Sequence, residues 1–205
     1  MIAEQTDTKS QFLQTLKISN LLPKEWVDKA LAKIETQDFP TSKEEYWKYT
    51  RPTKIINSAF TLNNKANFTL ENAAEFDIPN LECIRIVLLN GCFNAELSNI
   101  TTLPAGISIK PISAAALAGF ESKIEIHETN SQHIFTQINT AYATGGVFIT
   151  LAKNTVIDKT IHLINIHSVN DGIANMRNIV VAETSSSAKF IFSTRSTATT
   201  RTFTN

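Results

Sequence analysis

The chain has little of what marks several common classes of protein. Its 205 residues include only two cysteines, Cys83 and Cys92, with no CxxC pair and no histidine at ligand spacing, so a structural zinc site is not expected. No apolar run is long enough to cross a bilayer, and the first residues lack the basic stretch and apolar core of a secretory signal. We therefore expect a cytoplasmic protein with no membrane partner and with both thiols reduced.

An excess of charge of either sign is also lacking. Lysine and arginine total 19, aspartate and glutamate total 19, and the formal net charge is zero. A protein that binds nucleic acid by displacing counterions needs a basic excess, so nucleic acid is not expected as a partner. Zero net charge near neutral pH favours association, which leaves self-assembly, including a homodimer, open.

Familiar catalytic motifs are missing as well: GxxxxGK[ST], GxGxxG, HExxH and GxSxG do not occur. His162 and His167 are an odd number of positions apart, so they point to opposite faces of a continuous strand and cannot share one metal ion without a bulge. Asp158, Asp171 and Glu183 are isolated, so no carboxylate pair for glycoside cleavage is visible. The residues predict a binding or scaffold protein, not an enzyme, with no catalytic, cofactor-binding or metal-binding residue assigned.

Short runs rich in Val, Ile, Phe and Thr dominate the stretch from Gly145 to Ser193. They read GGVFIT, TVIDKTIHLINIHS, RNIVVAE and AKFIFS. Since β-branched and aromatic side chains fit a pleated, half-buried surface, these runs predict a stack of strands. Apolar residues occupy both faces of the runs, which predicts sheets buried on both sides. One side is expected to be the core, and the other to be covered by N-terminal helices or by another protein.

The earlier part of the chain divides into a helical region, residues 1–80, and a mixed α/β lead-in, residues 81–144. A helical hairpin is expected near the start, because a second helix that begins near Pro23 carries one apolar stripe made of Trp26, Val27, Ala30, Leu31 and Ile34. Residues 83–89 predict a strand, and Asn90-Gly91 predicts a two-residue hairpin turn. Cys92 beside that turn is either a small buried hydrophobe or a reactive thiol or metal ligand.

A short aromatic segment follows Phe39. Thr41 or Ser42 is suited to cap a short helix, with Glu44 or Glu45 completing a capping box. Three large aromatic residues then crowd into four positions: Tyr46, Trp47 and Tyr49. Such a turn either wedges into a groove of its own domain or offers an aromatic platform for a ligand.

The order of several motifs is similar to that of a known family. Residues 39–50, FPTSKEEYWKYT, match a P-T-x-x-x-E-x-W-K-Y-T segment through Pro40, Thr41, Glu45, Trp47, Lys48 and Tyr49. Asn90 and Gly91 match an N-G-x-F turn, and Asn139, Gly146 and Phe148 match the entry into a strand core. In this order the motifs resemble the SufB/SufD family of iron–sulfur cluster assembly subunits and, within it, the SufD branch. These motif residues are expected to have structural or interaction roles.

The resemblance implies a mainly β fold with N-terminal helices, in which an α+β region precedes the start of a right-handed parallel β-helix at residues 145–205. It also implies a complex with a SufB-like subunit and a SufC-like ATPase, in which this branch is a non-catalytic scaffold. An iron–sulfur cluster and a flavin would belong to the full complex, and none is expected on this chain. Members of the family are much longer, so the β-helix is expected to be unfinished, with an open end that pairs with another chain or aggregates.

Two other functions stay open. A solitary β-helix protein that binds or cleaves carbohydrate would need clustered Asp, Glu or Arg on one strand face. A small adhesive module would use the threonine-rich end, where Thr197, Thr199, Thr202 and Thr204 occur without a regular Thr-x-Thr row.

Overall fold

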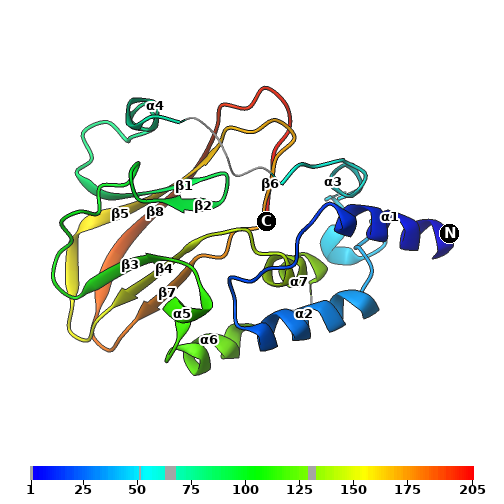
Figure 1. Cartoon of the computed structure of the whole chain (residues 1–205), viewed down its shortest axis with the longest axis horizontal. Helices are drawn as coiled ribbons and strands as arrows, with labels where there is room; N and C mark the ends of the chain where they lie inside the picture. Colours follow the sequence, from blue (N-terminus) through cyan, green and yellow to red (C-terminus); the bar gives the residue numbers. More distant parts are fainter. Residues whose placement is uncertain (1, 51, 63–67, 129–132) are drawn as a thin grey trace.

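The computed structural model describes residues 2–50, 52–62, 68–128 and 133–205, and it is a mixed helix-and-sheet fold whose sheets stay open (Figure 1). The helices are α1 (Ile2–Gln14), α2 (Lys24–Thr36), the 3₁₀ turn η1 (Glu45–Trp47), α3 (Thr53–Ile56), α4 (Leu70–Ala74), α5 (Ala114–Leu117), α6 (Glu121–Glu128) and α7 (Ile134–Ala141). The strands are β1 (Cys83–Leu89), β2 (Cys92–Asn94), β3 (Ile107–Pro111), β4 (Val147–Leu151), β5 (Val156–His167), β6 (Ile173–Ala174), β7 (Ile179–Ala182), β8 (Ser187–Ser196) and β9 (Phe203–Thr204). The expected combination of N-terminal helices with a strand-rich later part is confirmed at this level.

The strands form a four-stranded sheet in the order β2-β1-β5-β8, a three-stranded sheet in the order β3-β4-β7, and the pair β6-β9. Strand β4 belongs to the three-stranded sheet, β5 to the four-stranded sheet and β6 to the two-stranded pair. Strands β7, β8 and β9 belong to the same three sheets in the same order. Each later strand pairs in parallel with its earlier counterpart, as shown by Phe148 with Ile179, Ile161 with Phe190, and Ile173 with Phe203. Consequently β7, β8 and β9 all lie at the last position of their sheets.

The predicted strand and hairpin in the lead-in are confirmed. β1 covers the predicted residues 83–89, and Leu89 pairs with Cys92 across a turn made of Asn90 and Gly91. Both turn residues have positive φ, 50° and 86°. Asparagine and glycine tolerate that conformation better than other residues, which is why this dipeptide sets the turn.

Apolar side chains from both larger sheets meet in a core between them. Ile149 of β4 and Ile161 and Leu163 of β5 are all buried in this core, together with Ile86 of β1. Alternation along the strands sends the intervening residues outward, and these are covered by other parts of the chain. Phe148 packs in a cluster with residues of α2 and α5.

A separate apolar cluster, which includes α4, covers the outer face of β5. Ile164 and Ile166 pack against Ala73 of α4, with Phe68 and Phe76 partly buried beside them. The two-sided burial predicted for these strands is therefore confirmed for β4 and for the second half of β5, where the cover comes from the chain itself. It is wrong for β7 and β8, whose residues are mostly exposed or only partly buried.

The N-terminal helices form the expected hairpin and pack together with α7 on one side of the sheets (Figure 1). Four residues of the predicted stripe, Trp26, Val27, Ala30 and Ile34, are buried, and the fifth, Leu31, is partly buried. Pro23 is the N-cap. In α1, Phe12 lies edge-on to Phe39 with ring centroids 5.5 Å apart. Such aromatic contacts add to area burial, so the helical part has a core of its own.

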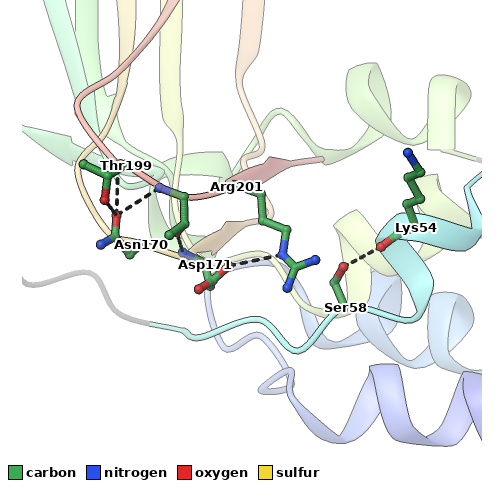
Figure 2. A network of polar contacts seen from close by, with 7 residues as sticks. Lys54, Ser58, Asn170, Asp171, Thr199 and Arg201 are labelled. Carbon is green, nitrogen blue, oxygen red and sulfur yellow. Dashed lines mark hydrogen bonds and ion pairs between the residues drawn. The ribbon is translucent and has the colours of Figure 1, made fainter.

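Hydrogen bonds join the corners that follow β5 and β8 (Figure 2). The side-chain oxygen of Asn170 accepts from the amide of Thr199 at 2.9 Å, and Arg201 Nε donates to Asp171 Oδ1 at 3.2 Å. The carbonyl of Asp171 also accepts from the amide of Thr61 at 2.8 Å. Figure 2 shows the end of α3 nearby, where the Ser58 hydroxyl donates to the carbonyl of Lys54. The corners are thus held by local polar contacts in addition to strand pairing.

We predict that Leu163→Ala lowers the free energy of unfolding by about 2–5 kcal/mol, because it removes methyl groups from the core and leaves a cavity. Leu163 is 3% exposed, whereas Val156, at the start of the same strand, is 65% exposed. Val156→Ala is the matched control and is expected to change stability by no more than about 0.5 kcal/mol. Urea titrations followed by circular dichroism measure both. Equal losses in the two variants would contradict the assignment of Leu163 to the core.

Candidate functional site

Several motif residues gather where α7 meets the strands. A Cβ atom on Gly145 would lie 2.3 Å from the carbonyl oxygen of Gly91, and one on Gly146 would lie 1.9 Å from the carbonyl oxygen of Arg177. Gly146 also has φ of 134°. Only glycine permits such close backbone approach in this conformation. The role of Gly146 in the family motif therefore has a structural basis.

Asn139 is the polar centre of this junction. Its side chain is buried, and Nδ2 donates to the carbonyl oxygens of Met176 at 2.8 Å and Asn205 at 2.7 Å. Its Oδ1 accepts from Arg177 Nη1 at 3.2 Å. A buried amide with these partners ties α7 to the segment after β6 and to the residue after β9.

Asn175 and Asn205 stand one above the other beside Asn139. Each directly follows one strand of the parallel pair β6 and β9, and Asn205 Nδ2 donates to Asn175 Oδ1 at 3.3 Å and to the carbonyl of Phe135 at 2.8 Å. Stacked amides of this kind stabilise parallel strands. Sequence reasoning missed this pair, and the available signal was the recurrence of Asn about thirty residues apart.

Two other motif residues have local structural roles. The side chain of Asn90 accepts from the amide of Ser168 at 2.9 Å and donates to its hydroxyl at 3.0 Å, which fixes the end of β5 against the β1–β2 turn. Phe148 is buried on the outer face of β4, with its ring 5.3 Å from that of Phe120. Neither side chain lines the junction around Asn139.

The aromatic segment around η1 packs against the start of α7. Trp47 packs against Phe135 of α7, with ring centroids 5.7 Å apart. Tyr46 and Tyr49 are 93% and 90% exposed. The segment is thus a half-exposed turn in which Trp47 packs into the domain and both tyrosines are exposed, because a single turn of 3₁₀ helix can bury only one of its sides. The interpretation of the segment as an aromatic platform for a ligand stays a prediction. Lys48 Nζ lies 5.6 Å from the centre of the Tyr49 ring, in the solvent-facing part of the segment.

The prediction that Thr41 or Ser42 caps the short helix is wrong, because the N-cap of η1 is Glu44 and it makes no side-chain capping hydrogen bond. The amide of Thr41 donates to Glu44 Oε1 at 2.9 Å, and Thr41 Oγ1 accepts from the amide of Lys43 at 3.3 Å. These contacts lie in the turn before η1, and both Glu44 and Glu45 are exposed. Pro40 lines a small hollow of about 120 Å³ with Trp47 and His133, among others.

A larger groove of about 740 Å³ runs along β7. Its lining includes Lys123, Asn139, Arg177, Asn178, Val180 and Asn205. Burial lowers the pKa of the Arg177 guanidinium, but arginine titrates so far above neutral pH that the group stays charged. The groove therefore combines strand backbone, amides and positive charge.

The two histidines of β5 lie on opposite faces, as predicted. His162 is fully buried with Nε2 2.9 Å from Ser193 Oγ of β8, whereas His167 Nε2 contacts Asn165 at 2.7 Å and the hydroxyl of Thr204 of β9. Burial lowers the pKa of both imidazoles. For His162, nearby Asp77 opposes the effect of burial on the pKa, and Arg195 and Arg85 add to it.

The cysteines are free. Cys92 donates to the carbonyl of Thr144 at 3.3 Å, and burial raises the pKa of its thiol, so the interpretation as a small hydrophobe is favoured over a reactive thiolate. Across the described ranges, no group of three or more His, Cys, Asp or Glu side chains is arranged to hold a metal ion. None of the described helices has the length and apolar character needed to cross a membrane.

Comparison with known proteins gives the family. The family model of the SufBD protein N-terminal region matches residues 9–163. The chain belongs to the SufBD family. One curated relative, an iron–sulfur cluster assembly SufBD family protein of Synechocystis sp., is 25% identical over 127 residues, which make up 61% of this chain and 28% of that relative. The chain therefore spans little more than a quarter of the relative's length, and the resemblance to the family is confirmed for its N-terminal region.

We predict that Gly146→Ala lowers the free energy of unfolding by about 3 kcal/mol or more, because the new Cβ atom would collide with backbone as well as strain a positive φ. Gly119 is the matched control: it has φ of 84°, and a Cβ atom added there would meet nothing within 4 Å. Gly119→Ala is expected to cost only about 1–2 kcal/mol. Denaturant titrations measure both. A Gly146→Ala variant as stable as Gly119→Ala would contradict the close approach to Arg177.

We also predict that the protein loses stability as the pH falls from 7.5 to 5.5. A lowered histidine pKa in the folded state means that the unfolded chain binds more protons below its own histidine pKa of about 6.5, so acid favours unfolding. The double variant His162→Gln/His167→Gln should flatten the dependence of the urea midpoint on pH. His133→Gln, at an exposed position, is the control and should leave that dependence unchanged. An unaltered slope in the double variant would contradict the assignment.

Proposed function

We propose that this chain is the N-terminal part of a SufD-like subunit that acts as a non-catalytic scaffold in an iron–sulfur cluster assembly complex. The observation that carries the proposal is the match of residues 9–163 to the SufBD N-terminal region. The SufD branch is supported by the segment from Pro40 to Thr50 and by the order of the later motifs. A SufB-like subunit and a SufC-like ATPase are the partners in this proposal, and the cytoplasm is its location.

The second part of the proposal is that residues 145–205 are the first coils of a right-handed parallel β-helix. The support is the repeated order of three strands, each parallel to its counterpart about thirty residues earlier. Matching turns add to it: Asn154 and Ser185 adopt positive φ of 61° and 59° at corresponding places after β4 and β7. The handedness follows from the family resemblance.

In the proposal, the cluster and any flavin belong to the assembled complex. A homodimer is the alternative assembly.

Neither of the other functions gains support. The comparisons name no protein that acts on carbohydrate. The threonine-rich end makes corner contacts, such as Thr199 with Asn170 and Thr200 with Asp171, which give it a local structural role.

We predict that the full-length protein carrying this chain co-purifies with SufB and SufC when the three are co-expressed. A tag on the present protein should recover both subunits, because the scaffold proposal requires a stable complex. Failure of the protein to recover either subunit would overturn the proposal.

A further inference from the structure

We propose that Arg85 and His162 form an acid-sensitive latch that holds residues 68–82 against the outer face of β1 and β5. The latch is closed while the His162 imidazole is neutral, and it opens when the imidazole gains a proton. This inference goes beyond the proposed function and rests on contacts within this chain, so it stands or falls independently of SufB and SufC.

The segment of residues 68–82 covers the outer face of the four-stranded sheet. Figure 1 shows α4 on the side of this sheet that faces away from β4. Ala73 is fully buried against the outward apolar side chains of β1 and β5, and Phe68 and Phe76 are partly buried beside it. Because α4 has only five residues, its attachment depends on these contacts more than on its own helical hydrogen bonds.

Two ion pairs join the second half of the segment to the strands. Arg85 Nη1 of β1 donates to Asp77 Oδ2 at 2.6 Å, and the Arg85 side chain is only 12% exposed. Lys159 Nζ of β5 lies 3.6 Å from Glu82 Oε2, but these two side chains are 59% and 89% exposed. Exposed pairs contribute little to stability, so the contact between Asp77 and Arg85 is the main ionic attachment.

His162 lies next to Arg85. The two residues are partners in the parallel ladder between β1 and β5, so their side chains leave the same face of the sheet. Arg85 Nε and His162 Nδ1 are both buried, and neither atom has a hydrogen-bond partner among the described residues. Arginine Nε–H is a donor, and Nδ1 of a neutral imidazole can accept. These two atoms therefore satisfy each other, by direct contact or through one bridging water molecule.

This pairing fixes the position of the proton on the neutral imidazole. When Nδ1 accepts from Arg85, the proton lies on Nε2. His162 Nε2 is 2.9 Å from Ser193 Oγ of β8, and it then donates to that hydroxyl. Both ring nitrogens are satisfied only while the imidazole is neutral.

A second proton on His162 would disrupt the latch. It would turn Nδ1 into a donor that faces the donor of Arg85. Charges near His162 come from Asp77 after α4, from Arg85 of β1 and from Arg195 of β8, so two cations would oppose the imidazolium and one carboxylate would favour it. Cys83, two residues before Arg85, keeps a neutral thiol because burial raises its pKa. Movement of residues 68–82 away from the sheet lets water reach the charged ring.

The direction of the pH effect follows from linkage. Burial lowers the pKa of His162 in the closed state, and access of water in the open state restores a pKa of about 6.5. Protons therefore bind the open state more readily below pH 6.5, and a fall from pH 7.5 to 5.5 raises the open fraction by at most about tenfold. Opening uncovers an apolar patch made of Val87, Leu89, Ile164 and Ile166.

Amide hydrogen exchange of the 205-residue protein tests the latch. The amides of Ala73, Phe76 and Asp77 donate within the segment, so they report its opening. Their protection factors should fall severalfold, up to about tenfold, between pH 7.5 and 5.5. Low concentrations of urea should change this exchange little, because a local opening exposes less surface than global unfolding does.

Two matched variants identify the histidine that is responsible. His162→Gln should make the protection of these amides independent of pH. His167→Gln, on the same strand but on the opposite face, should retain the fall. Equal pH dependence in His162→Gln and in the unaltered protein would overturn the inference, as would amides that have no measurable protection at pH 7.5.

A measurement on the unaltered protein avoids reliance on variants that could fail to fold. A long-range proton–nitrogen NMR spectrum at pH 7.5 should show that the proton of neutral His162 lies on Nε2. A proton on Nδ1 would overturn the inference, because Nδ1 could not then accept from Arg85.

Discussion

The parallel pairing of β5 is the interaction on which the rest of the structure depends. β5 is hydrogen-bonded to β1 on one side and to β8 on the other, and its two faces contribute to separate apolar clusters. A strand buried on both faces and paired on both edges has little freedom to slip, since a shift of one residue would exchange every inward side chain with an outward one. The lead-in strand β1 is therefore as much a part of the stack as the strands that follow it.

Local chemistry explains what could be predicted from the sequence. Asn90-Gly91 sets a turn through its own backbone preferences, and the stripe from Trp26 to Ile34 sets the buried face of α2 through helical spacing. The partner of each strand could not be predicted in this way. Phe148 pairs with Ile179 and Ile161 with Phe190, and these residues share only apolar character. Pairing across such a separation depends on tertiary packing, which leaves little trace in a single sequence.

The candidate site could be predicted only in part, because the contacts between its residues also depend on tertiary packing. Gly146 and Asn139 were identified as motif residues, but their meeting with Arg177 depends on how α7 docks onto the strands. Helix α7 also links the two regions in which motif residues occur, since Phe135 contacts Trp47 and Asn139 lies one helical turn further on. The groove along β7 had no sequence signal, because its lining comes from segments far apart in the chain. The exposure of Tyr46 likewise depends on the short 3₁₀ turn, which sequence spacing did not reveal.

The pairing of Thr61 with Gly172 has a consequence for how the chain folds during synthesis. Thr61 forms a parallel bridge to Gly172 beside β6, β1 pairs with β5 in parallel, and β3 pairs with β4 in the antiparallel sense. Each of the three rows of strands therefore begins with a segment that leaves the ribosome before residue 112. Since N-terminal parts fold first during synthesis, a template for every row is available before the first repeated strand emerges. The later strands then need only to add, one at a time, to an edge that already exists.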